Sequence, residues 1–184
     1  MQKATTDLST FNNSDYDPGS KLKRIVWYYI NAVFMRSRWL PMYGFKRFLL
    51  RAFGATIGKD VVIKPAVNIK YPWKLTIGDY AWIGEEVWID NLSQVTIGNH
   101  CCISQGALLL CGNHNYKKVS FDLISRPITL EDGCWIGAKA TVTGGVVCKS
   151  HSLLAVNSAT SVNLDAYTIY RGNPAVAVKE RKIS

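Results

Sequence analysis

The sequence predicts an all-β fold, a parallel β-helix of hexapeptide repeats with a short helical region before it and a short tail after it. Two observations carry this prediction. An apolar, mostly aliphatic residue returns at every sixth position, and the residue four places later is mostly small. A helix repeats near 3.6 residues and a flat strand near 2, so a period of six fits neither but is typical of a hexapeptide β-helix. The repeated positions are Ile57, Ile63, Ile69, Ile77, Ile83, Ile89, Ile97, Ile103, Leu109, Leu130, Ile136, Val142, Cys148 and Leu154.

A longer repeat indicates triangular coils. Ile57, Ile77 and Ile97 follow one another at intervals of 20 residues, and the later coils repeat at 18. Three hexapeptides, with or without two extra residues, suit a coil of three short strands. Stacked coils lie about 4.8 Å apart and bury their apolar residues on their neighbours. We therefore expect the β-helix to span residues 57–166 and a short tail to follow over 167–184.

Composition and cysteine usage indicate a globular protein of the cytoplasm. The 184 residues are 48% hydrophobic and 19% charged, which suits one folded domain. The first 20 residues are polar and unlike a secretory signal, and the longest mostly apolar run, residues 25–35, is too short for a membrane span. Of five cysteines, Cys101, Cys134 and Cys148 fall on inward positions that suit a small apolar side chain, so we expect free thiols in a reducing compartment.

The excess positive charge lies before the β-helix. Residues 18–59 hold nine Lys or Arg and no acid, whereas the rest of the chain holds 13 residues of each sign. This stretch is also rich in aromatic residues, and we expect a flexible segment over 1–20 and a basic-aromatic helical cap over 21–56. Three interpretations stay open: a cap on the solenoid, a surface on anionic lipid at the inner membrane face through residues 21–51, or a nucleic-acid surface. No nucleic-acid motif accompanies the charge, so we expect no nucleic-acid partner.

The repeat is interrupted once, next to a histidine. The next apolar residue in phase comes 33 residues after Ile97 instead of 20, so thirteen residues are inserted, roughly 115–127. Solenoids carry insertions on their outer face, often at a binding site. His114 stands at the root of this loop, where a neutral imidazole can accept a proton; a plain surface histidine is the alternative. His100 and His151 each lie three positions after an inward residue and are expected to face outward or line a corner.

Several long motifs, in order, resemble one enzyme family. They lie between about residues 47 and 181 and read FGATIGKDVVIKPAVNIKYPWKLTIGDYAWIGEEVWI, ISQGALLLCGNHNY, CWIGAKA and YRGNPAVAVKER. With these motifs the chain resembles the hexapeptide-repeat acyltransferases, and among them the sugar O-acetyltransferases of colanic acid and related exopolysaccharide biosynthesis. The resemblance implies a left-handed β-helix, a homotrimer, acetyl-CoA as the donor and His114 as the catalytic base.

The resemblance also implies a mechanism that needs neither a metal nor a prosthetic group. His114 would take the proton of a sugar hydroxyl while its oxygen attacks the thioester. Backbone N–H groups at Gly137 and Ala138 would stabilise the oxyanion. Expected acceptor contacts are Asp90, Asn91, Glu86 and Trp135. For Asp90 and Asn91 a turn-forming corner is the alternative, and for Trp135 the alternative is packing.

Coenzyme A is expected in an outer groove between neighbouring subunits. The family positions are Gly137, Ala138, Val156, Thr160 and Arg171. The chain departs from the family where many relatives carry a Thr-Lys pair and a later cation, because it has Ser161-Val162 and Ala177-Val178 there. The cations that could replace these phosphate partners are Arg171, Lys179, Arg181 and Lys182.

Other functions of this fold would leave other signatures. A γ-type carbonic anhydrase needs three histidines at short spacing, and the three histidines here are not so spaced. A serine O-acetyltransferase would carry a long helical domain, whereas about 56 residues precede the first coil. Two alternatives stay open: an N-acetyltransferase acting on a nucleotide-linked amino sugar, and a non-catalytic structural solenoid.

Overall fold

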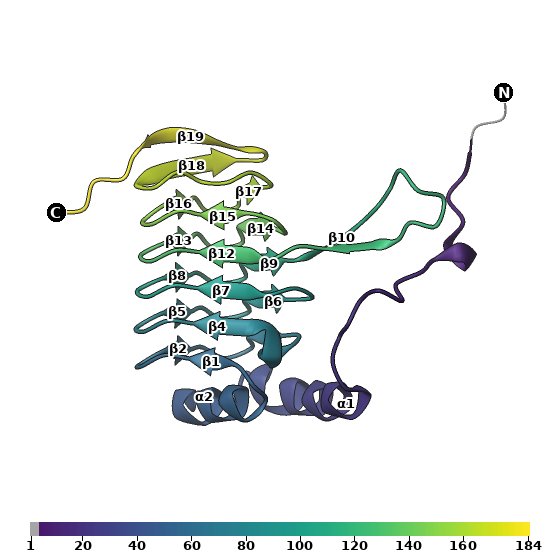
Figure 1. Cartoon of the computed structure of the whole chain (residues 1–184). Helices are drawn as coiled ribbons and strands as arrows, with labels where there is room; N and C mark the ends of the chain where they lie inside the picture. The colour runs from purple at the N-terminus through teal and green to yellow at the C-terminus, as the bar shows by residue number, and fades with distance from the viewer. Residues whose placement is uncertain (1–3) are drawn as a thin grey trace.

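The computed structural model describes residues 4–184 as a triangular prism of stacked coils (Figure 1). Helices lie at the lower end of the prism, a β-hairpin closes the upper end, and a second hairpin projects from its side. The coils climb from the helices toward the C-terminus in a left-handed sense. The predicted fold class, a parallel β-helix with a short helical region, is confirmed.

The three faces of the prism are parallel sheets with one strand from each coil. The first sheet contains β1 (Thr56–Ile57), β4 (Leu75–Ile77), β7 (Val95–Ile97), β12 (Ile128–Leu130) and β15 (Val147–Cys148). The second contains β2 (Val62–Ile63), β5 (Trp82–Ile83), β8 (Cys102–Ile103), β13 (Trp135–Ile136) and β16 (Leu153–Leu154). The third contains β3 (Asn68–Ile69), β6 (Trp88–Asp90), β9 (Leu108–Leu110), β14 (Thr141–Thr143) and β17 (Ala159–Thr160).

Apolar side chains stack at the same position of successive coils. In the first sheet the parallel register pairs Ile57 with Ile77, then Ile77 with Ile97, Ile97 with Leu130 and Leu130 with Cys148. All five side chains are buried and belong to one continuous core. The six-residue period therefore marks the inward positions, as predicted, and each coil buries itself on the next.

The chain turns at three corners. The first corner joins the first and second sheets, the second corner joins the second and third, and the third corner leads back to the first sheet. At the first corner one residue per coil has a positive φ, 54° at His100 and 59° at His151. The ring of His100 stacks on Tyr80, and that of His151 stacks on Tyr167. The expectation that both histidines line corners is confirmed.

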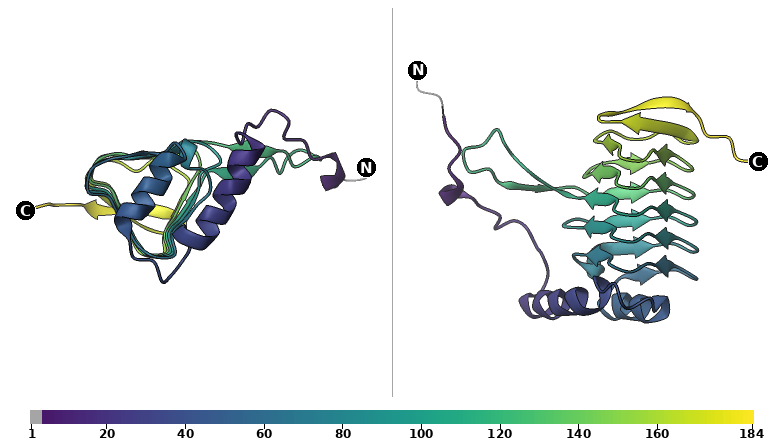
Figure 2. Two further views of the ribbon diagram at one scale, coloured as in Figure 1. Left: turned by 90° about the horizontal axis from the view of Figure 1, so that it is seen from below. Right: turned by 180° about the vertical axis from the view of Figure 1, so that it is seen from behind.

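The basic-aromatic region closes the lower end of the prism and contains α1 (Lys21–Ile30), η2 (Asn31–Met35) and α2 (Tyr43–Ala52). Seen from below, α2 crosses the end of the prism and α1 lies along its edge, so the region is a cap (Figure 2). Trp27 anchors α1 because its indole N–H donates to the Ile69 carbonyl at 2.8 Å. Lys46 anchors α2: its buried ammonium donates to the Lys64 carbonyl at 2.9 Å, and burial lowers the pKa of Lys46 to about 8.

Two hairpins and two short helical turns complete the fold. The side hairpin consists of β10 (Gly112–His114) and β11 (Leu123–Ser125) and leaves the solenoid at the third corner. Residues 4–20 run along it, and the Asp7 N–H donates to the Val119 carbonyl at 2.9 Å. The expected C-terminal tail contains a hairpin whose first strand extends the second sheet. Its strands are β18 (Thr168–Gly172) and β19 (Ala175–Glu180), and the short turns are η1 (Leu8–Thr10) and η3 (Pro72–Lys74).

Candidate active site

His114 ends β10, and its imidazole is held by a backbone carbonyl. Its Nδ1 lies 2.9 Å from the carbonyl oxygen of Phe121, which closes the hairpin with a φ of 51°. A carbonyl oxygen can only accept a hydrogen bond, so Nδ1 carries the proton of the neutral ring. Nε2 then keeps its lone pair, which is the arrangement that a general base needs.

Two aromatic rings flank this imidazole. The Phe121 ring stacks on His114 with centroids 4.5 Å apart and planes 7° from parallel. The Phe11 ring lies 6.0 Å away at 54°. Together with the hydrogen bond, these contacts fix both the position and the tilt of His114. Neither phenylalanine was singled out from the sequence, since Phe11 lies far away in the chain and Phe121 lies inside the insertion.

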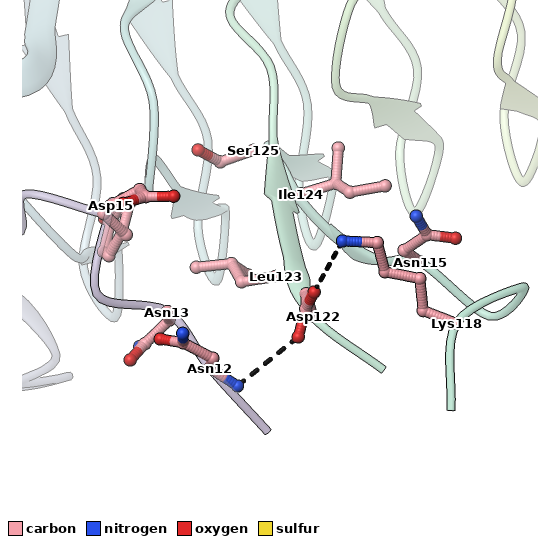
Figure 3. Close-up of a pocket in the computed structure, with 10 residues that line it drawn as sticks. Asn12, Asn13, Asp15, Asn115, Lys118, Asp122, Leu123, Ile124 and Ser125 are labelled. Atoms are coloured by element: carbon pink, nitrogen blue, oxygen red, sulfur yellow. Dashed lines mark hydrogen bonds and ion pairs between the residues drawn. The ribbon is translucent and has the colours of Figure 1, made fainter. Parts of the chain in front are cut away.

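A polar cavity adjoins the side hairpin. This hairpin cavity, about 430 Å³ in volume, lies between β11 and the N-terminal segment (Figure 3). The Asp122 carboxylate accepts from the Lys118 ammonium at 3.0 Å and from the Asn12 N–H at 3.4 Å, and the bond from Lys118 lowers the pKa of Asp122. Asn115, the residue after His114, lines the same cavity.

Asp90 and Asn91 were both expected to contact the acceptor, and of the two only Asp90 lies beside the side hairpin with its carboxylate. Asp90 ends β6 and lies beside the hairpin root, since a Cβ atom on Gly112 would be 3.7 Å from its Oδ2. It is 6% exposed, and the Lys70 ammonium lies 2.9 Å from its Oδ1.

The expected contact between Asn91 and the acceptor is wrong. It is fully buried, and its side-chain amide bonds the backbone of Tyr71 and Lys74. The amide therefore stabilises the third corner and offers no contact to a ligand. The turn interpretation holds for this residue.

Glu86 and Trp135 lie away from His114 in the same chain. Glu86 is at the second corner, where it forms an exposed ion pair with Arg38. Trp135 is exposed on β13, and its indole N–H donates to the Ser104 hydroxyl at 2.9 Å. His114 leaves the solenoid at the third corner, so one chain does not bring these residues together.

Four of the five residues expected to bind the donor follow or end strands of the second sheet and lie along the second corner, whereas Thr160 ends β17 in the third sheet. The Gly137 N–H already donates to the Leu154 carbonyl at 2.7 Å, and a Cβ atom there would lie 2.6 Å from the Val156 nitrogen. Gly137 therefore permits close stacking of two coils, and its N–H is not available to an oxyanion. The Ala138 N–H, by contrast, has no hydrogen-bond acceptor among residues 4–184. The side chain of Val156 is exposed one coil above.

The expected contact between the Thr160 hydroxyl and the donor is also wrong. Thr160 is buried, and its hydroxyl donates a hydrogen bond to the Val162 carbonyl at 2.8 Å, which stabilises the turn after β17.

Two of the cations expected near the donor phosphates differ in their contacts. The Arg181 guanidinium donates hydrogen bonds to the carbonyls of Gly133 and His151 at 2.8 and 3.1 Å, so it stabilises the fold. Arg171 is exposed at the end of β18 and forms no ion pair within the described part of the chain.

The thiols of the described residues are free. All five cysteines are free thiols, and Cys101, Cys134 and Cys148 are buried as predicted. Between residues 4 and 184 no group of three or more His, Cys, Asp or Glu is arranged to hold a metal ion.

Comparisons with known proteins identify the family. No family model matches the chain. The chain is 39% identical over 178 residues to a protein assigned as the colanic acid biosynthesis acetyltransferase WcaF of Escherichia coli K12, covering 95% of this chain and 97% of that protein. The chain belongs to the hexapeptide-repeat acetyltransferases. It is an acyltransferase, similar to the acetyltransferase assigned to colanic acid biosynthesis in Escherichia coli.

Solved structures share the fold. A hexapeptide-repeat acetyltransferase of Vibrio cholerae in complex with acetyl coenzyme A matches with a TM-score of 0.79 and 22% identity, over 91% of this chain and 93% of that one. A maltose O-acetyltransferase of Clostridium difficile 630 matches with a TM-score of 0.78 and 16% identity, over 89% and 90% of the two chains.

Proposed function

We propose that this enzyme transfers the acetyl group of acetyl-CoA to a sugar hydroxyl during the synthesis of an exopolysaccharide or other surface polysaccharide. The hydrogen bond between His114 Nδ1 and the Phe121 carbonyl carries the proposal, because it leaves Nε2 free to accept a proton. Family membership supports acetyl transfer, and the name of the Escherichia coli relative supports a polysaccharide pathway. The acetyl coenzyme A complex of the Vibrio cholerae protein supports the donor.

The reaction follows from these groups. Nε2 of His114 accepts the hydroxyl proton while the oxygen attacks the thioester carbon. The tetrahedral oxyanion accepts a hydrogen bond from the Ala138 N–H. The intermediate collapses, the C–S bond breaks, and the imidazolium returns the proton to the leaving thiolate. No covalent enzyme intermediate is needed.

The site is assembled from two subunits. His114 ends β10 beyond the third corner, whereas Ala138, Val156 and Arg171 follow the second corner of the same prism. A homotrimer would set the side hairpin of one subunit against the second corner of the next, and three equivalent sites would close the ring. The same contact would bring Trp135 of the neighbour toward the acceptor.

The cap gives a reason for peripheral membrane contact. Lys21 and Arg24 flank a face of α1 that exposes apolar and aromatic side chains, a combination that suits anionic lipid. Within residues 4–184 no helix has the length and apolar character to cross a bilayer. The exposed residues of this face are Leu22, Ile25, Val26, Tyr28 and Tyr29 on α1, and Val33 on η2 continues it.

A sedimentation experiment tests this contact. Wild type and a Leu22→Ser/Ile25→Ser/Tyr29→Ser variant would be spun with vesicles of phosphatidylcholine alone or with phosphatidylglycerol. The proposal expects wild type to pellet with the anionic vesicles and the variant to stay in solution. Equal partitioning of the two proteins contradicts it.

A panel of donors and acceptors, read by mass spectrometry, tests the reaction. Acetyl-CoA would be offered with neutral sugars, amino sugars, nucleotide sugars and lipid-linked sugars, using wild type and His114→Ala. The proposal expects an alkali-labile acetyl ester on a sugar hydroxyl, formed by wild type alone. An acid- and alkali-stable amide on an amino sugar would instead establish N-acetylation. Equal rates of acetyl transfer by wild type and His114→Ala would contradict the assignment of His114 as the general base.

A further inference from the structure

A second cavity lies against the cap, and no step of the proposed reaction uses it. This helix pocket, about 300 Å³ in volume, lies between α1, η2 and the outer side of the third sheet. The residues that line it include two arginines, two exposed aromatic residues and one acid: Arg24, Arg36, Tyr28, Trp88 and Asp90. Side chains from the cap and from two coils therefore meet around one space.

The helix pocket carries positive charge that the protein leaves unpaired. Asp90 and Lys70 offset each other at 2.9 Å. Arg24 and Arg36 form no ion pair among residues 4–184, and the Nε of Arg24 is buried without a hydrogen-bond acceptor. A buried donor without an acceptor is unfavourable. Because this Nε is closed to solvent, an anion in the pocket would bind Arg24 through the outer Nη atoms of its guanidinium group.

The pocket is polarised along its length. The two arginines approach from the helical side, whereas Asp90 lies beside Gly112 at the root of the side hairpin. Asp90 Oδ1 is buried against the Lys70 ammonium at 2.9 Å, which marks the end of the pocket away from the two arginines as the one without excess positive charge. His114 follows Gly112 by two residues, which in an extended strand is about 7 Å. A ligand with an anion at one end and hydroxyls at the other would therefore point its hydroxyls toward the hairpin.

Aromatic side chains give the pocket flat apolar surfaces. Tyr28 and Trp88 line it, and both remain exposed. Such rings bind the apolar face of a sugar or a nucleobase, while the charged groups fix its orientation.

We propose that the helix pocket binds the phosphate or diphosphate group of a phosphorylated sugar acceptor, with Arg24 and Arg36 as its partners. Guanidinium groups suit this role because they bind phosphate oxygens in pairs and remain charged at any physiological pH. The direction of the sugar toward His114 rests on the proposed acetyl transfer; the phosphate site does not. Nucleotide carriers and polyprenyl lipid carriers both contain this diphosphate chemistry.

Binding of inorganic pyrophosphate to the full-length protein tests the site without catalysis. Calorimetry at low salt would compare wild type, Arg24→Gln/Arg36→Gln, and the control Lys21→Gln/Lys59→Gln, which removes the same charge from exposed positions outside the pocket. We expect about 10- to 100-fold weaker binding for the pocket variant and a change within about twofold for the control. No binding to wild type, or equal losses in the two variants, overturns the proposal.

Three further measurements make the result decisive. Thermal unfolding would check that the variants fold. If Arg24→Gln/Arg36→Gln does not fold, Arg24→Lys/Arg36→Lys takes its place. We expect the lysine variant also to bind pyrophosphate more weakly than the control variant does. His114→Ala should bind pyrophosphate as wild type does, so a failed base assignment and a failed phosphate site are distinguishable. Displacement of pyrophosphate by UDP-galactose or by farnesyl-diphospho-galactose would identify the carrier, and displacement by neither contradicts an acceptor role.

Discussion

The solenoid and the side hairpin differ in how far their side chains are buried. In the solenoid a short repeat places apolar residues such as Ile83, Ile103 and Ile136 at equivalent inward positions, and all three are completely buried. In the hairpin between Gly112 and Ser125 no side chain is fully buried, and a hydrogen bond and aromatic stacking hold His114 in place of a core. The coils therefore supply the stability of the molecule, and the side hairpin supplies the base of the proposed reaction.

The largest effect is expected from the hairpin, on rate alone. His114→Ala should lower kcat by about 10²- to 10⁴-fold, because the base that accepts the hydroxyl proton is lost. The melting temperature should stay near that of wild type, since His114 lies outside the stacked coils. Steady-state kinetics and thermal unfolding measure the two effects, and a large loss of stability would mean that the hairpin belongs to the core.

The matching change in the solenoid should affect stability. Ile103→Ala should lower the free energy of unfolding by about 2–5 kcal/mol, because it leaves a cavity between coils. Val119→Ala on the hairpin is the matched control and should cost less than about 0.5 kcal/mol, since this valine is 47% exposed. Urea unfolding compares them, and equal costs would erase the distinction between the regions.

A smaller effect on rate should follow from removing the ring that stacks on the base. Phe121→Gly keeps a residue that tolerates the φ of 51° but frees His114 to tilt, and kcat should fall by up to about 10²-fold. Phe11→Leu should cost less, because this ring is tilted and more distant. A kcat unchanged by Phe121→Gly would show that the carbonyl alone orients the imidazole.

An effect that appears only at alkaline pH concerns the one buried lysine of the cap. Burial lowers the pKa of Lys46 from 10.5 to about 8, so between these values the unfolded chain binds more protons than the folded one. Lys46 should therefore make the protein more stable as the pH rises from about 8 to about 10.5. Lys46→Met should lack this gain when both proteins are unfolded in urea with a reductant, and identical pH profiles would contradict the assignment.

Periodicity predicted the coils, and its interruption predicted the hairpin root. Inward positions repeat because each coil packs on a neighbouring coil of similar structure, so they can be recognised in the sequence without knowing which distant residues are in contact. The hand of the coil came from the family resemblance alone. The hairpin over 168–180 was missed, although its Gly-Asn-Pro turn between apolar runs is a turn signal.

The site was less predictable, because residue types do not reveal how the backbone uses them. Asn91 and Thr160 resemble ligand contacts in sequence, yet their polar atoms are bonded to the backbone at the corners. The partner of His114 is the carbonyl of Phe121, which no residue pattern encodes. Phe11 reaches the site only because residues 4–20 fold back along the hairpin.

The central claim is that each site combines His114 of one subunit with the second corner of its neighbour. Subunits carrying His114→Ala and subunits carrying Ala138→Glu, which places a bulky anion where the oxyanion would form, should each be inactive alone. In randomly mixed trimers about one quarter of the junctions would contain both native halves, so activity should recover to about one quarter of wild type. Mixed trimers that stay inactive, or a monomer with full activity, would contradict the account.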